Sequence, residues 1–176
     1  IKNSDEMFDF AKQQEVKNFI AEEFIDLNLY HVDGFVRDGE LSYLIPSEYF
    51  ENTLAFHHGR STGSVQLNEA QPLYDLILSF TKKLLKGFET PKDYIFHLEV
   101  FSDGKEVIFL EIGSRLGGGR ILQEIENEFK FNPVQELLKI RLGFASKLDE
   151  KRKYHIKNIR GFVLPLPGKG KLVSLP

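Results

Sequence analysis

The stretch that decides the fold is a pair of apolar runs around a short turn: Ile95-Phe-His-Leu-Glu-Val-Phe101, then Ser102-Asp-Gly-Lys105, then Val107-Ile-Phe-Leu-Glu-Ile-Gly-Ser-Arg115. Both runs are rich in Ile, Val and Phe, and Asp-Gly between two such runs is a strong signal for a β-hairpin. The stretch therefore predicts two neighbouring antiparallel strands, each of which carries one glutamate, Glu99 or Glu111.

The two glutamates are expected to face each other. Side chains alternate between the faces of a strand, and a turn centred on Lys105 pairs position 99 with position 111. Like charges in directly opposed positions destabilise a sheet unless a positive group lies between them. Because oxygen ligands without Cys or a His-rich spacing suit hard cations, the pair predicts a site for Mg²⁺ or Mn²⁺ rather than Zn²⁺. The alternative is a solvent-facing hairpin with two independent surface glutamates.

The residues after Glu111 add groups that bind anions. Arg115 offers a planar fork of donors, and Gly117, Gly118 and Gly119 leave the backbone free to approach a ligand closely. Carboxylates, a metal ion, an Arg and a glycine loop together are typical of a site that handles phosphoryl groups. A plain flexible turn is the alternative interpretation of the three glycines.

With these residues the chain resembles the ATP-grasp superfamily, and within it the carboxylate-amine ligases. The resemblance rests on three segments in this order: Ile20-Ala-Glu-Glu-Phe-Ile25, Tyr30-His-Val-Asp-Gly-Phe-Val-Arg-Asp-Gly39, and His97-Leu-Glu99 leading to Glu111-Ile-Gly-Ser-Arg-Leu-Gly-Gly-Gly119. It implies an α+β fold, the C-terminal lobe of an ATP-grasp domain, with an antiparallel sheet flanked by helices. It also implies that the chain is truncated at both ends.

The resemblance implies a nucleotide site next to a metal site. The family's hinge segment holds adenine, and a Glu after it commonly binds ribose; no such Glu follows the hinge here, so Asp33 or His31 is expected to replace it. Gly113 stands where the family commonly has an Asn metal ligand, and water could fill that position. The expected cofactor-binding residues are Glu22, Glu23, Phe24, Ile25 and Asp33.

The remaining roles follow from the same resemblance. Glu99 and Glu111 match the metal ligands, and Arg115 matches the catalytic Arg that steadies an acyl phosphate. His97 lies on the same strand face as Glu99 and is expected near phosphate, although packing beside Phe109 is the alternative. The expected substrate-binding residues are Arg60, His97, Gly117, Gly118 and Gly119.

The implied function is an ATP-dependent carboxylate-amine ligase that uses Mg²⁺ or Mn²⁺. ATP phosphorylates a substrate carboxylate, and an amine attacks the acyl phosphate to form an amide or peptide bond. The expected partners are a small-molecule carboxylate and amine, a missing N-terminal part of the same enzyme, and a second copy of the chain as a homodimer; the isolated chain is expected to be inactive. Two alternatives stay open: a non-catalytic nucleotide-binding module, and a biotin carboxylase or purine-type ligase with the same lobe.

Composition agrees with one ordinary globular domain in the cytoplasm. The 176 residues are 41% hydrophobic, which is enough for a sizeable core. The net charge of -3 and scattered Lys and Arg give no basic face for nucleic acid. No apolar run reaches membrane-spanning length and no signal peptide opens the chain, so no membrane partner is expected. The absence of Cys favours a reducing compartment.

The organisation along the chain is predicted from hydrophobic spacing and turn residues. Residues 1–145 are expected to form the nucleotide- and metal-binding lobe, and 146–176 a connection and the start of a β-rich subdomain with two strands around a Pro/Gly turn. Between positions 48 and 68 a long loop with some strand is expected. The predicted strands are 19–25, 31–36 and 41–45, and the predicted helices are 5–14 capped by Ser4, 72–86, and 133–142 capped by Asn132.

Overall fold

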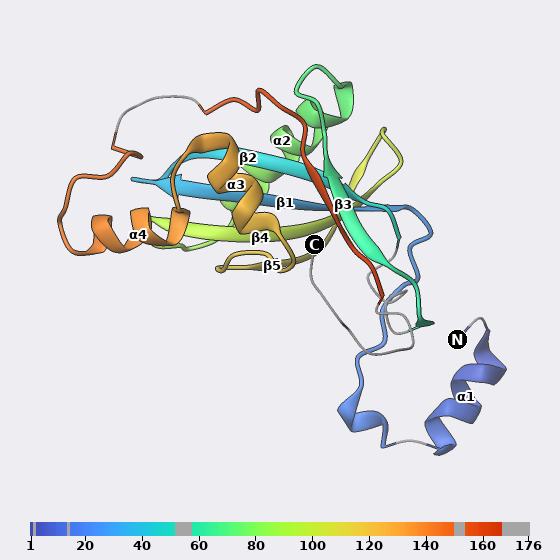
Figure 1. Cartoon of the computed structure of the whole chain (residues 1–176). Coiled ribbons are helices and arrows are strands. Elements are labelled where there is room, and N and C mark those ends of the chain that lie inside the picture. Colours follow the sequence, from blue (N-terminus) through green and yellow to red (C-terminus); the bar gives the residue numbers. More distant parts are fainter. Residues whose placement is uncertain (2, 14, 52–57, 150–153, 167–176) are drawn as a thin grey trace, which may run out of the picture.

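The computed structural model describes residues 1, 3–13, 15–51, 58–149 and 154–166 (Figure 1). They form a six-stranded antiparallel sheet in the order β5-β4-β1-β2-β3-β6. The elements are α1 (Ser4–Gln13), the 3₁₀ helix η1 (Val16–Asn18), β1 (Asn28–Arg37), β2 (Glu40–Tyr49), β3 (Thr62–Gln66), α2 (Pro72–Leu85), β4 (Tyr94–Ser102), β5 (Val107–Gly113), α3 (Ile121–Phe129), α4 (Pro133–Arg141) and β6 (Gly161–Leu164). The predicted α+β class, an antiparallel sheet flanked by helices, is confirmed.

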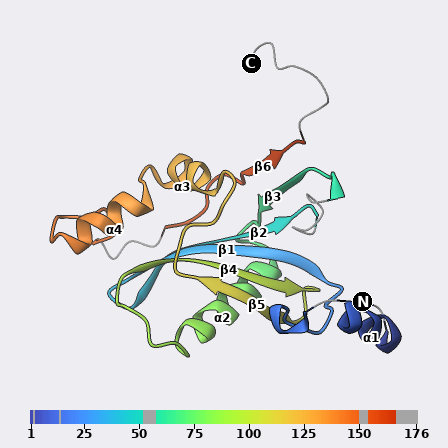
Figure 2. The ribbon, with the colours of Figure 1, turned by 90° about the horizontal axis from the view of Figure 1, so that it is seen from below.

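The molecule has three layers. Figure 2 shows α2 on one face of the sheet and α3 with α4 on the other, which we call the α3 face. Alternate residues of the central strands supply the two cores: Val32 and Phe96 pack toward α2, whereas Phe35 and Ile95 pack toward α3. Because both faces are covered, β1 is buried along nearly its whole length.

The turns agree with their sequences. Asp38 and Gly39 both have positive φ, 52° and 81°, between the paired residues Arg37 and Glu40. This is the two-residue loop that Asp-Gly favours between twisted strands. The strands around it are longer than the predicted 31–36 and 41–45, because their polar ends also pair.

Two of the predicted helices are confirmed at both ends. Helix α2 begins at Pro72, and α4 begins after Asn132, whose side chain accepts hydrogen bonds from the backbone N–H of Val134 and Gln135. Gly143, with φ of 75°, follows the end of α4. In α1 the capping residue is Asn3 rather than Ser4, since Asn3 Oδ1 accepts from Glu6 N at 2.9 Å.

Two features differ from the sequence expectations: helix α3 was not predicted, and residues 19–25 form no strand. Strand β3 agrees with the strand expected within the 48–68 loop. Strand β6, which follows the predicted domain boundary at residue 145, pairs with β3 in the main sheet. The division into two domains at that residue therefore stays a prediction. The second strand expected near the C-terminus lies outside the described residues. Within the described ranges, every helix is too short or too polar to cross a lipid bilayer.

Candidate functional site

Glu99 of β4 and Glu111 of β5 are directly paired across neighbouring antiparallel strands, as the sequence predicted. The route to that register is different from the expected one. Ser102 pairs with Val107, so the loop is residues 103–106 and is not centred on Lys105. A β-bulge then places the extra residue Leu110 in β5, and the bulge brings the two glutamates opposite each other.

A row of polar residues continues from this pair across the sheet. Each member is the register partner of the next, so all five share one face of five neighbouring strands. The row ends beneath α3, where the Gln66 side chain lies 3.5 Å from Glu124. In order, the row is Glu111, Glu99, His31, Ser47 and Gln66.

Asp33 lies on the same face of the sheet as this row, and its carboxylate is hydrogen-bonded to two imidazole rings. Its Oδ2 lies 2.6 Å from His31 Nδ1 and its Oδ1 lies 2.9 Å from His97 Nδ1. The far side of the His31 ring is also held, because Ser64 Oγ lies 2.8 Å from Nε2. Burial would raise the pKa of Asp33, but the hydrogen bonds from His31 and His97 outweigh it and lower the pKa to about 2. Asp33 is therefore a buried anion at neutral pH.

The same network fixes Glu99. Tyr49 donates to Glu99 Oε1 at 2.8 Å, and His97 Nε2 lies 3.6 Å from that oxygen. Burial raises the pKa of Glu99, but His97 and Tyr49 offset this effect and hold the pKa below its usual value. The pKa of His97 is lowered by burial yet reaches about 9 because Asp33 and Glu99 favour the imidazolium. Glu99 is thus kept charged and in one orientation.

The glycine loop rests on this network. A Cβ on Gly117 would lie 2.6 Å from His97 Nδ1 and 2.8 Å from Asp33 Oδ1. Only a glycine allows the backbone to come this close to the buried pair. A Cβ on Gly118 would meet nothing within 4 Å, so the two neighbouring glycines have different surroundings.

Arg115 lies between the loop and Glu111. Its side chain is half exposed, it donates to the carbonyl of Leu116 at 3.0 Å, and Nη2 is 3.9 Å from Glu111 Oε1. A Cβ on Gly113 would lie 3.2 Å from Arg115 Cγ. The Arg115 side chain therefore covers Gly113, the position at which the resemblance leads one to expect Asn.

Other predicted site residues lie apart from this group. Arg60 forms an ion pair with Glu51. Asp33, expected at ribose, is instead buried with both oxygens bonded to imidazoles, so the geometry does not favour that role. The hinge residues Glu22, Glu23, Phe24 and Ile25 form no regular structure, and Phe24 is 80% exposed.

Within the described residues, the group close enough to share a metal ion is His31, Asp33 and His97. Direct hydrogen bonds already join these three, so we interpret the group as a hydrogen-bonded triad. The sequence interpretation missed Tyr49 as a partner of Glu99, although the alternation of Tyr43, Ile45, Ser47 and Tyr49 along β2 places it on the α3 face.

Comparison with known proteins agrees with this architecture. No protein-family model matches the chain. The L-arginine-specific L-amino acid ligase of Bacillus subtilis is 32% identical over 124 residues, which are 69% of this chain and 29% of that protein.

Solved structures share the fold at lower identity. The L-amino acid ligase from Bacillus licheniformis superimposes with a TM-score of 0.70 at 15% identity, covering 92% of this chain and 40% of that one. The N5-carboxyaminoimidazole ribonucleotide synthetase from Thermus thermophilus gives 0.60 at 15% identity, covering 92% and 42%. The chain spans less than half the length of each of these relatives. The ligase match and the shared architecture together show that this chain has the ATP-grasp fold of the carboxylate-amine ligase type.

Proposed function

We propose that this chain carries the metal- and acceptor-binding part of an ATP-dependent carboxylate-amine ligase that acts through an acyl phosphate. The observation that carries the proposal is the opposed pair Glu99 and Glu111, with Glu99 held as an anion by His97 and Tyr49. Two relatives are amino acid ligases by name, which supports a carboxylate and an amine as substrates. Amino acids are therefore the first substrates to test, and the cytoplasm is the proposed location.

The donor set fits a magnesium ion. Glu99 and Glu111 offer hard carboxylate oxygens, and the Glu111 side chain is 61% exposed and so accessible. A bound Mg²⁺ or Mn²⁺ would neutralise phosphate charge on ATP. The buried triad keeps Glu99 ionised, so this ligand needs no proton loss before it binds the ion.

Arg115 and the glycine loop are proposed to bind the reacting groups. Arg115 lies 3.9 Å from Glu111 with half of its side chain exposed, so its fork can reach an anionic acyl phosphate beside the two carboxylates. Gly117, Gly118 and Gly119 are proposed to present backbone N–H groups to the acceptor. Adenine is proposed to bind at residues 22–25, and Arg60 is proposed to lie near substrate. His97 is proposed to act through Glu99 instead, because it is buried and its two ring nitrogens face Asp33 and Glu99.

The activity is proposed for a polypeptide longer than these 176 residues. The chain covers 29% of the curated relative and 40% of the Bacillus licheniformis structure, so other segments are proposed to grip the phosphates of ATP. On its own the chain is expected to bind the metal ion and to turn over ATP slowly or not at all.

The metal assignment is testable on this chain directly. Mn²⁺ binding can be measured from the decrease of the EPR signal of the free ion. The affinity for Mn²⁺ is expected to fall at least about tenfold in Glu99→Gln and Glu111→Gln, because each substitution removes one ionic ligand. Glu106→Gln is the matched control, since Glu106 is an exposed glutamate of the same hairpin. Equal Mn²⁺ affinity in all variants would overturn the metal site.

Catalysis needs a second measurement. The assay uses the longer protein in which this chain is joined to the other segments of the proposed ligase. ADP release is measured in the presence of ATP, Mg²⁺ and pairs of L-amino acids. Amino-acid-dependent ADP release that is lost in Glu111→Gln supports the ligase. Metal binding without any ADP release would support the non-catalytic nucleotide-binding module instead.

A further inference from the structure

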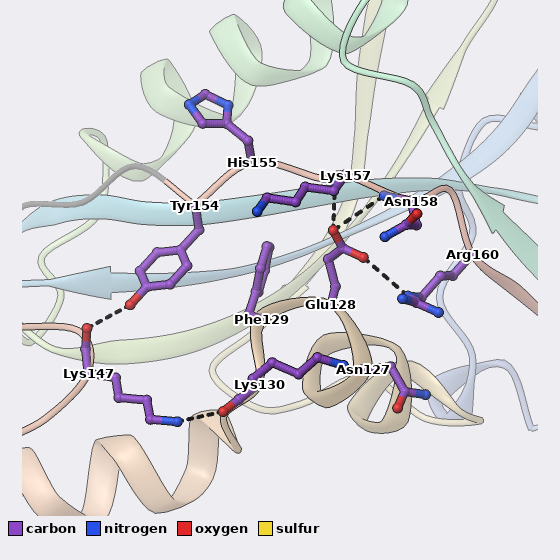
Figure 3. A pocket seen from close by; sticks show the side chains of 10 residues that line it. All are labelled: Asn127, Glu128, Phe129, Lys130, Lys147, Tyr154, His155, Lys157, Asn158 and Arg160. Carbon is purple, nitrogen blue, oxygen red and sulfur yellow. Dashed lines mark hydrogen bonds and ion pairs between the residues drawn. The ribbon is translucent and has the colours of Figure 1, made fainter.

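A pocket lies at the far end of α3, away from the candidate site. It has a volume of about 650 Å³ and is formed where the last turn of α3 meets the chain at residues 147 and 154–160 (Figure 3). None of the residues that line it belongs to the polar row, the buried triad or the glycine loop. A pocket of this size accommodates a small organic molecule.

The lining is strongly basic. It contains four cationic side chains, from Lys130, Lys147, Lys157 and Arg160. In the described part of the chain, neither the Lys130 nor the Lys157 ammonium forms an ion pair, and Lys147 Nζ donates to the carbonyl of Lys130 at 2.6 Å. These charges are therefore available to an anion from solvent.

The carboxylate in the lining, Glu128, pairs with Arg160 and does not compete for the three lysine ammonium groups. Glu128 is 2% exposed and accepts from the backbone N–H of Lys157 at 2.5 Å and of Asn158 at 3.3 Å, and from Arg160 Nε at 3.2 Å. Although burial raises the pKa of Glu128, these hydrogen bonds lower it below its usual value. Glu128 acts as an internal anchor that holds the 157–160 segment against α3 and keeps Arg160 in place.

One wall of the pocket is aromatic. The rings of Phe129 and Tyr154 meet edge to face at 5.4 Å, and Tyr154 donates to the carbonyl of Lys147 at 2.6 Å. In Figure 3 both rings lie between the side chains of Lys147 and Lys157. Hydrogen bonds thus tie the wall to the basic residues, so the pocket is already formed in the free protein.

We propose that this pocket binds a phosphate monoester that carries a planar ring. Lysine ammonium groups are compact point charges suited to a phosphate dianion, and the wall of Phe129 and Tyr154 suits a flat aromatic group. The proposal does not depend on ligase activity, because no residue of the candidate site is involved.

Phenyl phosphate is the probe, titrated into ¹⁵N-labelled protein and followed by two-dimensional NMR. The expected result is saturable shifts at the amides of Lys130, Lys157 and Asn158, with binding at least about fivefold tighter than for methyl phosphate or phenol, since each lacks one of the two recognised groups.

The basic residues are tested with a matched pair of double variants. Lys130→Ala/Lys157→Ala is expected to weaken binding about fivefold or more, whereas Lys82→Ala/Lys83→Ala, two lysines of α2 on the opposite side of the sheet, is expected to leave it unchanged. None of the four side chains belongs to the buried core, so both variants are expected to fold. Each of three results would overturn the proposal. The first is that the amide chemical-shift changes centre on Gly117–Gly119, and the second is that both double variants lose the same amount of affinity for phenyl phosphate. The third is that methyl phosphate binds as tightly as phenyl phosphate. Failure of these tests would leave the Mn²⁺ result at Glu99 and Glu111 unaffected.

Discussion

Replacing Asp33 by Asn tests whether the buried triad holds the sheet together. The change keeps the size of the side chain but removes the charge between His31 and His97, at a site that is 1% exposed. The Asp33 pKa of about 2, against 3.8 for a free side chain, corresponds to about 2 kcal/mol of stability. Removing one partner of a buried charged group costs about 3–5 kcal/mol, so we expect a loss of about 3 kcal/mol at pH 7.

The stability lost in Asp33→Asn is also expected to depend on pH, in a direction set by the lowered pKa of Asp33. A carboxylate with a lowered folded-state pKa stabilises the protein fully above pH 3.8, and that stability is lost as the pH falls through about 2. The gap between wild type and Asp33→Asn is therefore expected to narrow by about 1 kcal/mol on going from pH 5 to pH 3, a window in which wild-type His97, with a pKa of about 9, stays charged. Urea unfolding followed by circular dichroism at both pH values measures it.

Asp26→Asn is the control for this experiment. Asp26 is an exposed carboxylate outside regular structure, and its loss is expected to change the free energy of unfolding by less than about 0.5 kcal/mol. The reasoning is refuted if Asp33→Asn costs no more than this control, or if its cost at pH 3 equals its cost at pH 5.

Three further predictions concern the loop, the metal pair and the end of the polar row. Gly117→Ala is expected to cost about 1–3 kcal/mol in thermal unfolding, because its methyl group would lie 2.5 to 2.8 Å from three side-chain atoms, whereas Gly118→Ala is expected to be neutral. In the intact ligase, Glu111→Gln and Arg115→Lys should each lower turnover by orders of magnitude, and raised Mg²⁺ should partly rescue only Glu111→Gln; equal rescue of both would contradict these roles. Burial raises the pKa of Glu124 to about 7, so stability should fall as the pH rises from about 4.5 to 7, by up to about 3 kcal/mol, and Glu124→Gln should remove that slope in urea unfolding.

The elements with strong local signals were predictable from the sequence. The Asp38-Gly39 turn, the Asn132 cap and the hairpin around Asp103 depend on residues within a few positions of one another. Helix α3 lacks a local start signal, since Arg120 before it makes no side-chain cap. Its apolar residues Ile121, Leu122, Ile125 and Phe129 do recur at helical spacing, and the sequence interpretation missed this pattern. Packing against the sheet stabilises the buried side of the helix.

The buried network was beyond sequence reasoning for a different reason. His31 and Ser64 are 33 positions apart, and Asp33 and His97 are 64 apart, so their contacts depend on the order and register of four strands. A polar residue in the middle of a strand also lowers the strand signal rather than marking a partner. Membership of one hairpin made it predictable that Glu99 and Glu111 lie near each other, but their direct pairing depends on the bulge at Leu110, which had no signal in the sequence.

The bulge at Leu110 has a consequence for recognising such sites in other chains. The separation of twelve positions from Glu99 to Glu111 depends on a four-residue loop and one inserted residue, and neither length is required by the chemistry. A hairpin with the same loop, no bulge and a spacing of eleven would bring the same two carboxylates together, because residues directly opposed across antiparallel strands always share a face. Relatives should therefore be aligned by which residues are paired across the hairpin, and a fixed count of residues between the glutamates would reject chains that build an equivalent site.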